Sequence, residues 1–241
     1  MSHYIMELRR YLMFECACVT SRGGKEGVFD YTQKKFAFHS ISRTGGKISE
    51  ANVARIYASG YFWADNSEEI FVAKDIIEVD GCFNALKFCI DNMDELITPE
   101  YVAEMHSRLY PGTPLHMQEN LKHLISAYAR EPEAGNPTIR QDITDFHIRF
   151  IQYGGDSRTA SLISYMQCIN NFLTPFYIHA ENQAMYERYL KNIYNNIGKN
   201  NDFAEITYNK STAYELSYKF EDNKSSYQDK WGYEYNGNKL K

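Results

Sequence analysis

The chain has 241 residues, of which 44% are hydrophobic and 15% aromatic, and its formal net charge is −5 from 26 basic and 31 acidic side chains. A chain of this length and composition buries the core of one domain and is short for two full domains. Neither sign of charge forms a sustained run, so we expect no broad basic surface for nucleic-acid phosphates and no nucleic-acid partner.

The cysteine spacing and the lengths of the apolar stretches indicate in which cellular compartment the protein is expected. The five cysteines lack the paired C-x-x-C spacing and the histidine partners of a zinc site, so they are predicted to be reduced and mostly buried. The sequence shows neither a signal-peptide pattern at its start nor a stretch of about 18 apolar residues anywhere. We therefore expect a cytoplasmic protein without a membrane-embedded segment.

Helical periodicity dominates the chain and period-two alternation is scarce, which predicts an all-α fold. A short helix is expected to start after an N-cap at Ser49 and to stop near Gly60. An aromatic turn at 61–63 is interpreted as a core plug, and the acidic residues within 65–69 as a favourable charge arrangement at a helix start. The helix that follows, over about 67–92, has one apolar stripe.

Proline and cap residues place the next helices. Thr98 and Pro99 form an N-cap and a first helical position. A further helix is expected to begin after Pro114 and to end before Pro132, because a proline ring disfavours helix at the preceding residue. The stretch from 195 onward has weak periodicity and is expected to be frayed toward its end.

Two more helices, near 139–150 and 158–173, flank a loop at 152–157 with the sequence QYGGDS. Small residues that open a helix direct free backbone N–H groups and the positive end of the helix dipole toward one point, which suits a phosphate. Arg158 is able to add a bidentate contact to the same anion. The alternative interpretation is a plain turn between helices, capped by Asp156 or Ser157.

Several segments resemble, in order, those of the Fic (Fido) family. The stretches FAFHS at 36–40 and KISE at 47–50 resemble a family stretch that reads roughly HSxxIEGNxLT, and 76–88 and 96–109 resemble the two helices that follow it. Residues 146–150 (FHIRF) and 155–163 (GDSRTASLI) resemble the family's FHxRFExIHPFxDGNGRxGRLI. A later segment, SYQDKW at 226–231, resembles a C-terminal AQDKY stretch of some members. The resemblance covers roughly residues 30–195.

This resemblance implies a Fic/Fido-type helical bundle that transfers AMP from ATP to a hydroxyl of a target protein. The resemblance also implies that the chain has three parts: an N-terminal helical segment at 1–60, a Fic-like core at 61–195 and a C-terminal extension at 196–241. ATP is the implied nucleotide, with Mg²⁺ as its metal. The implied nucleotide-binding residues are Gly154, Gly155, Asp156, Ser157 and Arg158.

The chain departs from the family motif HPFx(D/E)GNGRxxR at its chemical positions. The family's histidine is the base, its acid holds Mg²⁺, and its two arginines bind the phosphates. With Arg158 aligned on the first arginine, Phe150 stands at the histidine, Gly154 at the acid and Ser161 at the second arginine. His147 lies 158 − 147 = 11 residues before Arg158, whereas the family's base lies eight before it, so His147 matches the structural histidine of FHxRF instead.

Two further motifs are reduced. The family's inhibitory motif (S/T)xxxE(G/N) is represented by Ser40 and Gly45, but Thr44 replaces its glutamate. The flap hairpin that aligns the target side chain is missing after Gly112. Base, metal ligand, flap and inhibitory pair are thus lost together.

Three hypotheses remain open on the sequence. The first is a Fic-fold pseudoenzyme that binds nucleotide or uses its surface for protein contacts. The second is a divergent transferase with Asp156 as metal ligand and His147 or Asp156 as base. The third is an unrelated helical interaction module. His39, His106 and His179 are interpreted as hydrogen-bonded core or boundary groups rather than ligands.

Overall fold

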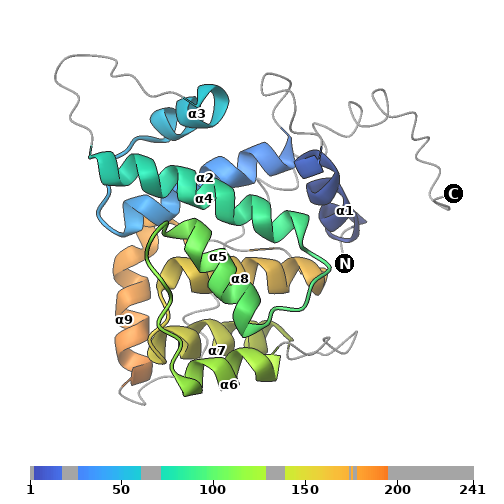
Figure 1. Cartoon of the computed structure of the whole chain (residues 1–241), viewed down its shortest axis with the longest axis vertical. Coiled ribbons are helices and arrows are strands. Elements are labelled where there is room, and N and C mark those ends of the chain that lie inside the picture. The colour runs from blue at the N-terminus through green and yellow to red at the C-terminus, as the bar shows by residue number, and fades with distance from the viewer. Residues whose placement is uncertain are drawn as a thin grey trace, which may run out of the picture.

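The structure is a computed structural model that describes residues 3–17, 27–60, 72–128, 139–173, 175 and 178–194. The described residues form helices without strands, so the all-α prediction is confirmed (Figure 1). The helices are α1 His3–Ala17, α2 Val28–Arg43, α3 Glu50–Ser59, α4 Ala73–Asp91, α5 Pro99–Leu109, α6 Glu119–Tyr128, α7 Ile139–Gln152, α8 Ser157–Asn170 and α9 Gln183–Tyr194, with a 3₁₀ turn, η1, at Ala180–Asn182.

Cap residues define several helix ends as the sequence predicts. The Ser49 hydroxyl accepts a hydrogen bond from the Asn52 amide, and Gly60 closes α3 in the left-handed region with φ 69°. The Thr98 hydroxyl accepts from the Tyr101 amide at the start of α5. The start of α4 differs from the expected one, since Val72 is its N-cap and the helix begins at Ala73 rather than near 67, whereas α6 begins after Pro114 as expected, at Glu119.

Helix α8 is the centre of the bundle. Every residue from Arg158 to Ile169 is buried, because α8 packs against α1, α4, α5 and α7 (Figure 1). A helix buried on all sides has no solvent face for its polar side chains. The polar residues of α8 must therefore bond inside the protein, and this is where the candidate site lies.

Helices α4 and α5 pack closely against each other, and both contact α8. A Cβ on Gly81 would lie 2.4 Å from the Leu109 carbonyl oxygen, so this glycine lets the two helices approach. On α5, Val102, Met105 and Leu109 form an apolar stripe that is fully enclosed. On α4, Val79, Leu86 and Ile90 are likewise buried, whereas Ile77 is exposed.

Some sequence expectations lie outside the described residues. These are the aromatic turn at 61–63, the acidic stretch at 65–69, the end of α6 near Pro132, the C-terminal extension and its segment 226–231. None of the described helices has both the length and the apolar character that crossing a membrane requires.

Candidate functional site

The turn between α7 and α8 closes tightly on Phe150. Gly154 has φ 92°, a conformation that favours glycine, and the Gly155 amide donates to the Phe150 carbonyl at 2.9 Å. A Cβ on Gly155 would lie 2.1 Å from the Phe150 ring, which is itself fully buried. Gly154 therefore serves the backbone conformation of the turn and Gly155 its packing, and both their amides already donate to carbonyl groups of α7.

Asp156 is the N-cap of α8. Its carboxylate accepts hydrogen bonds from the backbone amides of Arg158 at 3.0 Å and Thr159 at 2.9 Å. These are the amides that an anion at this helix end would need. The protein's own carboxylate thus occupies the helix N-terminus.

Three side chains complete the surroundings of the Asp156 carboxylate. His106 Nδ1 lies 3.0 Å from Oδ2, the Tyr110 hydroxyl donates to Oδ1 at 3.0 Å, and the Thr159 hydroxyl donates to Oδ2. Burial alone raises the pKa of Asp156, but the hydrogen bonds from His106 and Thr159 outweigh burial and lower it below its usual value. The carboxylate is therefore ionised, and both of its oxygens are engaged.

These bonds decide whether Mg²⁺ fits the site. Gly154, which the resemblance aligns with the family's acid, has no side-chain ligand, and Asp156 has both oxygens in hydrogen bonds with donors that a cation would have to displace. Mg²⁺ requires oxygen ligands in nearly octahedral geometry. The residues present do not fit a magnesium site.

Arg158 is buried beside this network, with only 2% of its surface exposed. Its Nη2 donates to Glu78 Oε2 at 2.7 Å and to the Thr44 hydroxyl, and its guanidinium lies 5.5 Å from the centre of the Tyr110 ring. Within the described part of the chain, its Nε and Nη1 have no hydrogen-bond partner. A guanidinium has five N–H groups that need hydrogen-bond acceptors when it is buried. In Arg158 those of Nη2 have acceptors, whereas those of Nε and Nη1 have none among the described residues.

A second buried arginine lies near the first. Arg43, the last residue of α2 and 7% exposed, places its guanidinium 5.0 Å from the centre of the Tyr186 ring and hydrogen-bonds that side chain. Burial, together with repulsion from Arg158, lowers the pKa of Arg43. Its Nε and Nη1 also find no partner among the described residues. Sequence reasoning missed this residue, because it lies 115 positions from Arg158.

His147 is fully enclosed. Its Nδ1 lies 3.1 Å from the Ser164 hydroxyl and its Nε2 lies 2.8 Å from the Tyr186 hydroxyl. Burial, with a contribution from Arg43, lowers the pKa of His147 to about 3. The ring is therefore neutral and has both nitrogens bonded inside the core.

Of the three residues predicted to be a remnant of the inhibitory motif, the structure brings one to the site. Thr44 contacts Arg158, whereas Ser40 is buried within α2 and Gly45 has φ 87° with open space beside it. Ser161, at the family's second arginine, donates to the Ser157 carbonyl at 2.7 Å.

Sequence reasoning also missed Glu78 and Tyr110, and it interpreted His106 as a hydrogen-bonded core or boundary group without naming its partner, Asp156. Glu78, His106 and Tyr110 all contact Asp156 or Arg158 from other helices or from a helix end. The sequence feature that indicates a shared position for His106 and Tyr110 is their spacing of four residues, because side chains four residues apart lie on the same face of a helix.

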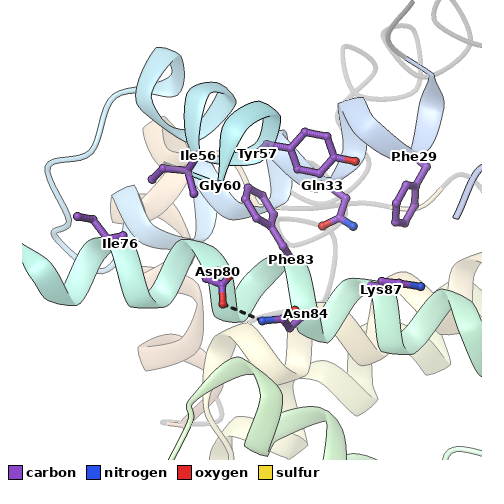
Figure 2. Close-up of a pocket in the computed structure, with 10 residues that line it drawn as sticks. All are labelled: Phe29, Gln33, Ile56, Tyr57, Gly60, Ile76, Asp80, Phe83, Asn84 and Lys87. Carbon is purple, nitrogen blue, oxygen red and sulfur yellow. Dashed lines mark hydrogen bonds between the residues drawn. The ribbon is translucent and has the colours of Figure 1, made fainter. Parts of the chain in front are cut away.

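A separate cavity of about 250 Å³ lies between α2, α3 and α4 (Figure 2). Phe29 and Phe83 line it, with Asp80 and Asn84 hydrogen-bonded to each other at 2.9 Å on α4. Lys87 is the one cation among its lining residues. The pair of arginines beside α8 is therefore the better match for a phosphate group.

Solved structures of Fic-domain proteins share this arrangement of helices. A Glu-to-Gly variant of a segment of Fic-1 from C. elegans matches with a TM-score of 0.63 and 17% identity, over 92% of this chain and 72% of that chain. The same segment without the change gives a TM-score of 0.60 and 18% identity, over 92% and 73%. A Fic-domain-containing signaling protein from Bacteroides thetaiotaomicron gives 0.57 and 14%, over 93% and 97%.

Sequence comparison adds nothing to these matches, since neither a protein-family model nor a curated protein matches the chain. At 14–18% identity the structural likeness defines the fold. The chain is a Fic-fold protein.

Proposed function

We propose that this chain is a Fic-family pseudoenzyme that binds a nucleotide through its phosphates and no longer transfers AMP. The observation that supports nucleotide binding is the pair of buried arginines, Arg43 and Arg158, whose Nε and Nη1 atoms have no partner among the described residues. A buried, unsatisfied guanidinium is costly, and it is expected where an anion completes its hydrogen bonds.

The phosphates would bind the guanidinium groups rather than the start of α8. Arg158 N–H and Thr159 N–H already donate to Asp156, and this carboxylate would repel a phosphate placed at the helix end. Arginine forms bidentate hydrogen bonds with phosphate oxygens, and two arginines match a polyphosphate better than a single phosphate. We therefore expect ATP to bind more tightly than AMP.

The loss of transfer is supported by the residues at the chemical positions. Phe150 and Gly154 are unable to act as base or metal ligand. His147 is neutral, but Ser164 and Tyr186 hold both of its nitrogens, so no nitrogen is directed toward a target hydroxyl. Loss of a general base alone lowers a rate by about 10²–10⁴.

Isothermal titration calorimetry tests the binding half of the proposal. Wild-type protein is titrated with ATP and AMP, with and without Mg²⁺, beside Arg158→Gln, Arg43→Gln and the exposed control Arg108→Gln. Loss of a charge-assisted contact is expected to weaken ATP binding by about tenfold or more in the two buried variants. Thermal unfolding of each variant establishes that it is folded at the titration temperature.

ATP labelled at the α-phosphate tests the catalytic half. We expect no labelled protein after incubation with a cell extract, and ATP binding that does not depend on Mg²⁺. Absence of heat with millimolar ATP would refute nucleotide binding and leave a scaffold that acts through its surface. Labelling of a protein that disappears in Asp156→Asn would favour the divergent transferase instead.

A further inference from the structure

A second cluster of chemistry-bearing side chains lies where the 179–182 turn meets α2. His39 belongs to α2, His179 is the N-cap of η1, and Glu181 lies within η1. The donor atoms of these three residues all lie within 4.8 Å of one another. The two histidines are 7% and 6% exposed, whereas Glu181 is 67% exposed, so the cluster is enclosed on its imidazole side and open to solvent at the carboxylate.

The three side chains are already directed toward one another. The two imidazole rings have centroids 4.5 Å apart and are tilted by 46°, and His179 Nδ1 lies 3.3 Å from Glu181 Oε1. His39 Nδ1 accepts a hydrogen bond from the Ala180 amide at 3.2 Å, so its lone pair faces the turn that holds the other two donors. A cation bound at this nitrogen takes the place of that hydrogen bond, and the Ala180 amide keeps its proton.

The surrounding charges leave Glu181 as the anion of the cluster. Lys35 and Arg43 are the cations of α2 that act on His39. Lys35 is paired with Glu50 at 2.7 Å, and Arg43 hydrogen-bonds the side chain of Tyr186. Neutral imidazoles carry no charge to offset that of a bound cation. The Glu181 carboxylate is the group of the cluster that does so.

We propose that His39, His179 and Glu181 form a binding site for one divalent transition-metal cation, for which Zn²⁺ is the best match. Two imidazoles and one carboxylate are a donor set that zinc takes in proteins, and three protein ligands leave a fourth position for water. The softness of imidazole nitrogen disfavours Ca²⁺ and Mg²⁺, which take oxygen ligands. The cation joins α2 to η1, which leads into α9.

Titration with Zn²⁺ and Co²⁺ tests this site, using the 241-residue chain purified without a histidine tag and treated with a chelator. We expect one equivalent to bind and Co²⁺ to give visible absorption bands of a low-coordinate site. Glu181→Gln and His179→Asn are expected to weaken binding by about tenfold or more, since each removes a ligand. Glu187→Gln, on the following helix, is the matched control and is expected to bind as the wild type does.

Thermal unfolding supplies a second readout. Zn²⁺ is expected to raise the melting temperature of the wild type and of Glu187→Gln but not that of Glu181→Gln. A double replacement of the exposed His116 and His123 by alanine is expected to retain the tight site. Equal metal affinity in the wild type and Glu181→Gln, or loss of binding in the His116/His123 variant, would overturn the proposal. The nucleotide proposal is unaffected by either result, because no nucleotide is present.

Discussion

Glu78→Gln removes the ion pair that holds Arg158, together with a longer pair between Glu78 and the exposed Lys74 at 3.6 Å. Glu78 Oε2 accepts from Arg158 Nη2 at 2.7 Å, and the two side chains are 12% and 2% exposed. The glutamine preserves shape and one acceptor but removes the negative charge, so a buried guanidinium loses its carboxylate.

Removal of one partner from a buried pair costs about 3–5 kcal/mol. The partial exposure of Glu78 and the remaining amide acceptor reduce this value, so we expect a loss of about 3 kcal/mol in the free energy of unfolding. Glu104→Gln is the control, because Glu104 pairs with Arg108 on the surface of α5, with side chains 51% and 44% exposed. Its loss is expected to stay within about 0.5 kcal/mol.

Urea unfolding of the wild type and both variants gives the comparison. The same Glu78→Gln protein is expected to bind ATP more tightly than the wild type, because the negative charge of Glu78 no longer repels phosphates bound at Arg158 Nε and Nη1. A stability loss equal to that of Glu104→Gln would refute the reasoning that the Glu78–Arg158 pair is buried and structural. Weaker ATP binding would refute the repulsion between Glu78 and the phosphates.

Three further predictions concern the frame of the site. Gly81→Ala is expected to lower the free energy of unfolding by about 2 kcal/mol, measured by urea unfolding. The new Cβ would lie 2.4 Å from the Leu109 carbonyl oxygen, and this overpacking outweighs the gain in helix propensity. An unchanged free energy of unfolding would contradict the close approach of α4 and α5. His147 has a pKa of about 3 in the folded protein against 6.5 unfolded, so the unfolded state binds more protons, and this residue lowers the free energy of unfolding by about 2 kcal/mol between pH 7 and pH 5. His147→Gln is expected to remove that part of the pH dependence. If the free energy of unfolding of this variant fell as steeply between pH 7 and pH 5 as that of the wild type, a residue other than His147 would be the one that takes up the proton. Asp156→Ala removes a helix cap and a buried acceptor and is expected to lower stability by about 2–3 kcal/mol, measured by thermal unfolding beside Asp156→Asn, which should retain more of it.

The all-α class followed from the sequence because helical periodicity and cap residues are local signals. Ser49, Gly60 and Thr98 define helix ends through bonds to residues three or four positions away. Pro114 shows the limit of such signals, since it permits a helix to begin but does not place its first turn, and α6 starts five residues later.

The candidate site was predictable only in part. The loop at 152–157 and Arg158 were visible as a motif, and the interpretation of Asp156 as an N-cap, offered as the alternative to an anion site, describes its backbone bonds. Glu78 contacts Arg158 across 80 positions of the chain, a pairing that no local pattern encodes. The same holds for His39 and His179, which share no motif and meet only because the 179–182 turn packs on α2.

Binding of phosphate by the two buried arginines is the central claim, and arginine Nε–H signals in a ¹H–¹⁵N NMR titration with ATP test it most directly. Arg43→Lys and Arg158→Lys variants assign the two signals, and the exposed Arg108 is an internal control. We predict saturable shifts of the Arg43 and Arg158 signals at the same ATP concentration, with smaller shifts for AMP and none for Arg108. Unchanged Arg43 and Arg158 signals at millimolar ATP would contradict the claim.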